Sequence, residues 1–210
     1  MHSLLARPIL CLVTNSYIVN NNQIVDCVTK AINGGVNMIQ MREKHLDFKE
    51  QLNLAQKLRA ITLNKALLII NNNIDIAMSV KADGIQTGKN GEKIKYIRSQ
   101  IDSQMLIGYS SHSLDESIQA TKEGANYLIA GPVFKTASHP ELRGKNTQFL
   151  CKIKNKINIP LLAIGGINLT NTKLLQKTKI NGIAVMRSIL ERKNPELAAR
   201  KLWIIVKKFR

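Results

Sequence analysis

The chain has 210 residues, of which 31 are Lys or Arg and 14 are Asp or Glu, giving a formal net charge of +17. A hydrophobic fraction of 44 % excludes a disordered chain, and no apolar run approaches the ~18–20 residues that a membrane span needs. The length is typical of one domain, which we expect to occupy residues 1–210.

Short apolar runs recur along the whole chain and predict strands that are buried on both faces, as in a parallel sheet. Eight such runs are present. They are Ile9–Val13, Met38–Met41, Leu67–Ile70, Gly84–Gln86, Met105–Gly108, Tyr127–Ala130, Leu161–Ile164 and Gly182–Val185.

Amphipathic segments separate these runs and predict helices. Asp47–Asn64 places Phe48, Leu52, Ala55 and Leu58 on one stripe, and Asp47 with Glu50 marks its start. Ser113-Leu-Asp-Glu116 has the spacing of a capping box, in which a hydroxyl and a carboxylate satisfy orphan amides. The last predicted helix is Pro195–Phe209, which opens on proline.

Eight strands that alternate with helices predict a single-domain α/β fold, the (β/α)₈ or TIM barrel. An open doubly wound sheet is the alternative. No predicted strand is followed by G-x-G-x-x-G, which favours the barrel.

The cysteines and the N-terminus indicate the compartment. Cys11, Cys27 and Cys151 are scattered and form no C-x-x-C pair, which argues against a disulfide framework or a cysteine-based zinc site. The first apolar stretch has no small-residue cleavage site after it, so no signal peptide is expected. We therefore expect a cytoplasmic protein.

The positive charge has three interpretations. Lysines are distributed along the chain, and only four Phe, four Tyr and one Trp are available to stack on bases. This pattern favours a compositional drift towards Lys, Asn and Ile over the steering of phosphorylated ligands, and both over nucleic-acid binding.

Active sites of barrels lie at the carboxyl ends of the strands, so the residues after each run are the candidates. In Gln40-Met-Arg-Glu-Lys44, alternation places Gln40, Arg42 and Lys44 on one side. Later runs are followed by further polar groups. These are Asn71 and Asn72, then Ser110 and His112, and then Thr136, Ser138 and His139.

The loops after the seventh and eighth runs have the residues of a phosphate site. Gly165 and Gly166 would let backbone amides approach a phosphate, and Arg187 with Ser188 follows the next run. Each of these features also has a structural interpretation, such as a tight turn for the glycine pair.

Taken in order, these motifs resemble the thiamine phosphate synthase/TenI family over roughly residues 9–190. The motifs include Gln-x-Arg-Glu-Lys, Ile-Asn-Asn, Gly-x-Ser-x-His, Gly-Pro-Val-Phe-x-Thr and Ala-Ile-Gly-Gly-Ile. The resemblance implies a small barrel, often a homodimer, that acts on a phosphorylated thiazole. The segment from Thr136 to Pro140 and that from Gly182 to Arg187 also resemble the TenI-like domain fused to Nudix hydrolases.

The resemblance also implies roles for single residues. Gln40, Arg42 and Lys44 match groups that hold a pyrimidine ring and its diphosphate. Asn71, Ser110, Thr136 and Ser138 match further substrate contacts, and His139 falls where synthases clamp the diphosphate with Lys. Gly166 and the backbone of Ser188 match contacts to the thiazole phosphate, and His112 matches a proton-shuttling histidine of TenI-like tautomerases.

The chain departs from the synthase pattern at the magnesium ligands. One ligand Asp is replaced by Asn72 and the other by Gly91, with Glu92 displaced by one residue. Magnesium prefers anionic oxygens at strict octahedral distances, so these changes weaken the expected metal site.

We therefore expect metal-independent thiazole tautomerisation with His112 as acid and base, since an imidazole pKa near 7 suits both halves of a proton transfer. One alternative is a thiamine phosphate synthase with a degenerate magnesium site. The other is a non-catalytic ligand-binding or regulatory protein.

Overall fold

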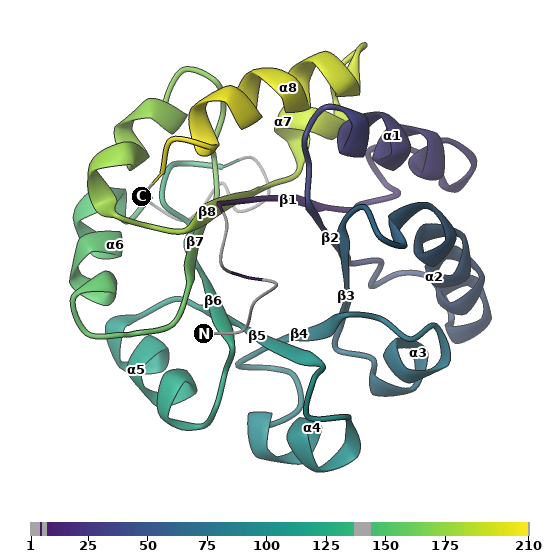
Figure 1. Ribbon diagram of the computed structural model, residues 1–210, viewed down its shortest axis with the longest axis horizontal. Coiled ribbons are helices and arrows are strands. Elements are labelled where there is room, and N and C mark those ends of the chain that lie inside the picture. Colours follow the sequence, from purple (N-terminus) through teal and green to yellow (C-terminus); the bar gives the residue numbers. More distant parts are fainter. Residues whose placement is uncertain (1–4, 6–7, 137–143, 210) are drawn as a thin grey trace.

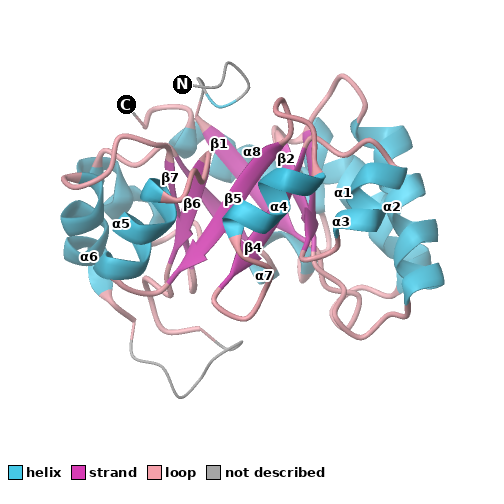
Figure 2. Ribbon diagram, turned by 90° about the horizontal axis from the view of Figure 1, so that it is seen from below, coloured by secondary structure: helices cyan, strands magenta, loops and turns pink. Residues whose placement is uncertain are grey.

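The protein is a closed barrel of eight parallel strands in the order of the chain, so the predicted fold class is confirmed. This computed structural model describes residues 5, 8–136 and 144–209. In Figure 1 the helices form a ring around the strands, and Figure 2 shows the strands crossing the middle of the molecule with helices on both sides.

The strands agree with the apolar runs, and β8 pairs with β1 to close the barrel. They are β1 (Ile9–Val13), β2 (Met38–Met41), β3 (Leu67–Asn71), β4 (Gly84–Gly88), β5 (Leu106–Ser111), β6 (Tyr127–Ala130), β7 (Leu161–Ile164) and β8 (Gly182–Val185).

Three strands run further than predicted at their carboxyl ends. The extra residues of β3, β4 and β5 are polar or small, so hydrophobicity does not mark them, yet the ladder continues through pairs such as Asn71 with Gln86 and Gly88 with Ser110. Predicted site residues Asn71 and Ser110 therefore lie on strands rather than in loops, which holds their side chains in a fixed alternation.

Helices connect the strands on the outside of the barrel. They are α1 (Asn21–Asn33), α2 (Phe48–Thr62), α3 (Ile74–Ser79), α4 (Ile94–Gln100), α5 (Leu114–Lys122), α6 (Asn146–Lys154), the 3₁₀ helix η2 (Thr172–Thr178), α7 (Arg187–Leu190) and α8 (Pro195–Val206).

The helix-start signals are largely confirmed. Asp47 and Glu50 each accept the backbone N–H of the other, which is a complete capping box. At α5 the Ser113 hydroxyl accepts the N–H of Glu116, but the Glu116 carboxylate accepts the N–H of His112 instead of that of Ser113.

The buried stripe of α2 is shifted from the predicted one, because Ala55 and Leu58 are buried as predicted but Leu52 is only half-buried. Leu54, Ala55 and Leu58 are buried, whereas Phe48 is 51 % exposed. Phe48 is the first residue of the helix, where the chain has only begun to run along the barrel wall.

Two apolar layers stabilise the barrel. Residues of one strand parity fill its interior, including Cys11, Met38, Ile69 and Tyr127, and the opposite parity packs against the helices. Because polar side chains replace the apolar ones only at the carboxyl ends of the strands, this packing fixes where a site can form.

Candidate active site at the carboxyl ends of the strands

Two amide side chains are paired inside the barrel at the carboxyl ends of its strands. Gln40 is 4 % exposed and donates from Nε2 to Oδ1 of Asn71 over 3.0 Å. Both residues were predicted site residues, and the structure brings them together across β2 and β3. Each amide keeps a second polar atom for a ligand, a carbonyl oxygen on Gln40 and N–H groups on Asn71.

A similar pair joins β4 to β5. Gln86 is fully buried and donates from Nε2 to the hydroxyl of the predicted residue Ser110 over 2.9 Å. The sequence analysis did not select Gln86, although it ends an apolar run. Since its Nε2 occupies an acceptor lone pair of Ser110, the hydroxyl proton of Ser110 is free to bond a ligand.

Gly108 makes room for the polar groups under this pair. A Cβ at residue 108 would lie 2.2 Å from Oε1 of Gln86 and 2.5 Å from the Tyr127 hydroxyl, so no side chain fits there. Both of those atoms are buried without a partner in the described part of the chain. Burial also raises the pKa of the Tyr127 phenol well above its ordinary value, so Tyr127 is a neutral donor under the site.

Two cations lie at the end of β2. Arg42 is half-buried and its backbone N–H donates to the Thr14 hydroxyl over 3.1 Å, while Lys44 is exposed. Neither side chain pairs with a carboxylate of the described residues. Two neighbouring unpaired cations are suited to an anionic ligand.

Glu43, between these cations, is a buried carboxylate that the sequence analysis did not identify. It is 3 % exposed, and its Oε2 accepts the backbone N–H and the hydroxyl of Ser16. The Ser16 hydroxyl also lies 2.8 Å from Nε2 of His45, whose ring stacks on Tyr17. The sequence pattern did not identify Ser16, because it lies in the segment after the first strand and outside every motif.

The two predicted glycines form a sharp turn after β7. Gly165 and Gly166 have φ values of 100° and 65°, which are strained for residues with a side chain. A Cβ on Gly166 would lie 2.3 Å from the carbonyl oxygen of Lys135, so the turn also packs closely on the segment after β6.

Four backbone N–H groups around this turn have no acceptor within the described residues. They belong to Gly166, Ile167, Arg187 and Ser188. Ser188 joins the two loops, because its hydroxyl donates to the carbonyl oxygen of Ile167. The Arg187 side chain pairs with Glu191, the residue that caps the end of α7. Free amides in two tied loops can bind a phosphate.

His112 lies after β5 and is held by two hydrogen bonds. Its backbone N–H donates to Glu116 over 2.6 Å, and its ring Nδ1 lies 2.9 Å from the carbonyl oxygen of Gly131. A carbonyl can only accept, so Nδ1 carries the proton and a neutral ring presents Nε2 as an acceptor.

The three consecutive asparagines after β3 have separate roles. Asn71 belongs to the amide pair, whereas Asn73 caps α3 by accepting the N–H of Ile76. Asn72 has a φ of 56°, a left-handed conformation that Asn and Asp adopt more readily than most residues. It lines a surface pocket of about 320 Å³ together with Asp75 and Glu92.

The donor groups near Asn72 suit magnesium poorly. A Cβ on Gly91 would lie 2.5 Å from Oδ1 of Asn72, so the amide occupies the space from which a second ligand would extend. Glu92 is exposed, and no group of three His, Cys, Asp or Glu residues in the described chain could hold a metal. A hard dication is bound best by carboxylates, and the amide of Asn72 supplies no negative charge.

The remaining predicted residues belong to the segment after β6. Thr136 is the last described residue of that segment before a gap at residues 137–143, so Ser138 and His139 lie outside the described residues.

No helix of the described chain is long and apolar enough to cross a membrane.

Comparison with known proteins gives a consistent result. The family model described as thiamine monophosphate synthase matches residues 10–189. A protein of Clostridium tetani named thiamine-phosphate synthase is 34 % identical over 203 residues, which cover 96 % of this chain and 97 % of that protein. One of the same name from Clostridium acetobutylicum is 34 % identical over 95 % of both chains.

The solved structures agree. The thiamine phosphate pyrophosphorylase of Pyrococcus furiosus superimposes with a TM-score of 0.90 at 33 % sequence identity, over 99 % of both chains.

These relatives correct the activity expected from the sequence. The tautomerase interpretation is wrong, because relatives that match nearly the whole chain are named as synthases. It rested on the loss of two acidic metal ligands and on His112, which are single positions. The similarity along the whole barrel outweighs them.

Proposed function

Because the chain belongs to the thiamine monophosphate synthase family, we propose that it is a thiamine-phosphate synthase, which joins a hydroxymethylpyrimidine diphosphate to a thiazole phosphate. The observation that carries the proposal is the similarity at 34 % identity over 96 % of the chain to a protein of that name. The geometry at the carboxyl ends of the strands supports it, since one end of the barrel offers groups for both substrates.

The pyrimidine diphosphate is assigned to the side formed by β2 and β3. The Gln40–Asn71 pair keeps one acceptor and one donor function for the edge of a pyrimidine ring. Arg42 and Lys44, which have no carboxylate partner in the described residues, neutralise the diphosphate.

The thiazole phosphate is assigned to the tied loops after β7 and β8. The free amides of Gly166, Ile167, Arg187 and Ser188 supply donors without the cost of moving a long side chain. Glycine at residue 166 is needed because a Cβ would collide with the backbone of the neighbouring loop.

In the coupling step, the thiazole ring nitrogen forms a bond to the methylene carbon of the pyrimidine, and the bond from that carbon to the diphosphate oxygen breaks. The nitrogen gives its lone pair and carries no proton, so the step needs no general base. Arg42 and Lys44 stabilise the charge that develops on the leaving diphosphate. His112, bonded to the carbonyl of Gly131, then acts by holding the segment after β6.

The residues present at the two magnesium positions do not fit the ion well, so no step is assigned to it. The test is the formation of thiamine phosphate from the two substrates, with magnesium and with a chelator. Product in either arm supports the proposal, and the pair of arms measures the metal requirement. Folded protein that forms no product in both arms overturns it.

A further inference from the structure

The carboxylates of this chain are distributed much less evenly than its lysines. Residues 144–210 hold 15 of the 31 Lys and Arg residues but only two of the 14 Asp and Glu residues. Those two, Glu191 and Glu196, pair with Arg187 and Arg200. The other described cations of this segment have no carboxylate partner among the described residues.

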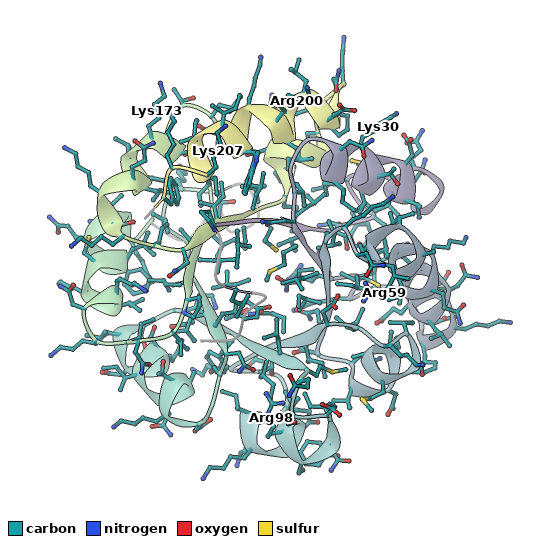
Figure 3. All side chains as sticks on the ribbon, in the orientation of Figure 1. Lys30, Arg59, Arg98, Lys173, Arg200 and Lys207 are labelled. Atoms are coloured by element: carbon teal, nitrogen blue, oxygen red, sulfur yellow. The ribbon has the colours of Figure 1, made fainter. Side chains whose placement is uncertain are left out.

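Most of the described cations of this segment lie on or next to α6, η2 and α8, on one side of the barrel wall. η2 packs against both α6 and α8, so the three elements form a continuous surface. Figure 3 labels Lys173, Lys207 and Arg200 on this side. We call the surface the basic face and define it by its exposed lysines. They are Lys152, Lys173, Lys177, Lys201, Lys207 and Lys208.

The basic face also exposes aliphatic side chains. Leu174 is 60 % exposed and Ile204 is 48 % exposed. On α8, Ile204 follows Lys201 by three residues, so the two side chains share one stripe of the helix, and Lys207 and Lys208 follow directly after its end. On η2, Lys177 follows Leu174 by one 3₁₀ turn.

This combination argues against two kinds of partner. Bases of a single strand stack on exposed aromatic rings, but Phe149 and Trp203 are half-buried and Phe209 is buried. A second copy of the chain, bound through the same face, would place lysines against lysines. Lysine is also depleted in protein interfaces generally.

Unpaired lysines interleaved with exposed aliphatic side chains are typical of surfaces that bind acidic lipids. We propose that the basic face binds the surface of a bilayer that contains acidic phospholipids, with Leu174 and Ile204 entering the interfacial layer. The lysines bind the acidic headgroups. Each adds to the electrostatic attraction, because none of them is paired with a carboxylate of the described residues. The proposal goes beyond the synthase reaction and does not depend on it.

The test is the partition of the full chain onto vesicles of phosphatidylcholine, with and without phosphatidylglycerol. We expect binding only to the vesicles with phosphatidylglycerol. Replacement of four lysines of the face by Gln lowers the partition coefficient by about tenfold or more. The four substitutions are Lys173→Gln, Lys177→Gln, Lys201→Gln and Lys208→Gln.

The matched control removes the same charge from exposed lysines elsewhere and leaves binding within about twofold. Its substitutions are Lys49→Gln, Lys57→Gln, Lys65→Gln and Lys95→Gln. Circular dichroism of both variants confirms the fold. Equal losses in the two variants overturn the proposal, because they would reflect net charge alone.

A second variant, Leu174→Ser with Ile204→Ser, keeps every charge. It weakens binding to acidic vesicles if the aliphatic side chains enter the interfacial layer. A duplex oligonucleotide is the competing polyanion. The proposal is wrong if the oligonucleotide binds more tightly than the vesicles and the serine variant binds both as the wild type does, which would assign the face to nucleic acid.

Discussion

Ser16 donates two hydrogen bonds to the Glu43 carboxylate, from its backbone N–H over 2.8 Å and from its hydroxyl over 2.7 Å. These bonds join the segment after β1 to the end of β2, between Arg42 and Lys44. The other carboxylate oxygen of Glu43 is buried without a partner in the described chain. A buried carboxylate held in this way fixes the backbone at residue 43, and we infer that it thereby positions the two cations on either side of it.

Glu43→Gln tests this positioning role. The amide keeps the shape but loses the charge that strengthens both bonds from Ser16, so we expect the free energy of unfolding to fall by about 1–3 kcal/mol. The KM for the pyrimidine diphosphate should rise more than kcat falls, because Arg42 and Lys44 bind that substrate. Steady-state kinetics and urea denaturation measure the two effects.

Two further variants separate positioning from general destabilisation. Glu50→Gln changes an exposed acid in the capping box of α2 and should leave KM unchanged. Ser16→Ala removes one of the two bonds and should give a smaller effect than Glu43→Gln in the same direction. A normal KM in a folded Glu43→Gln protein would refute the positioning role.

Gly166→Ala tests the phosphate loop. The residue has a φ of 65° and its Cβ would meet the Lys135 carbonyl oxygen at 2.3 Å, so strain and collision add. We expect a stability loss of about 2–4 kcal/mol and a rise of about tenfold or more in KM for the thiazole phosphate.

Gly124 provides the matched control for this substitution. Its φ is 99°, but no atom lies within 4 Å of where a Cβ would be. Gly124→Ala therefore reports backbone strain alone, with a loss of about 1 kcal/mol and no change in KM. Equal kinetic effects in the two variants would remove the loop after β7 from the site.

The order and type of the strands were predictable because burial on both faces leaves a continuous apolar run. The ends of β3 to β5 were not, since residues such as Thr87 and Tyr109 pair in the ladder without an apolar pattern. These residues belong to the strands because they are paired with a neighbouring strand of the barrel, and the sequence alone does not show that pairing.

Part of the site was predictable for a similar reason. Alternation along β2 places Gln40 inside the barrel, and the structure pairs it with Asn71. Glu43 was missed because its role depends on Ser16, which is 27 residues away in the chain. The predicted activity was wrong because it depended on a few positions, Asn72, Gly91 and His112. The similarity to synthases extends over nearly the whole chain.

The donor set at the magnesium positions can be tested by restoring carboxylates. Asn72→Asp with Gly91→Asp should increase the dependence of thiamine phosphate formation on magnesium, because anionic oxygens replace an amide and a hydrogen. Asp tolerates the left-handed conformation of residue 72, and the new side chain at 91 requires the end of residue 72 to rotate. Activity is measured across a magnesium titration.

Asn72→Asp with Gly91→Ala is the control, since it introduces a Cβ at residue 91 without a second carboxylate. If the crowding alone governs the result, both double variants lose activity together. A magnesium response that is the same in the wild type and in both variants would contradict our account of the donor set.

The buried thiol of Cys11 should make the free energy of unfolding fall at alkaline pH. Burial raises the pKa of this thiol to about 12, whereas an exposed thiol titrates near 8.5. The folded pKa lies above the unfolded one, so the stability is fully present below about pH 8.5 and is lost as the pH rises towards about 12. Cys27, raised to about 11, adds to the same trend.

We therefore expect the free energy of unfolding to fall between about pH 8 and pH 10 by about 2 kcal/mol more in the wild type than in Cys11→Ala. The alanine variant is less stable at every pH because a buried side chain is shortened, so the slope with pH is the informative quantity. Urea denaturation at several pH values gives this slope. Parallel slopes would mean that the Cys11 thiol titrates in the folded barrel as it does in the unfolded chain, which its complete burial in the barrel interior argues against.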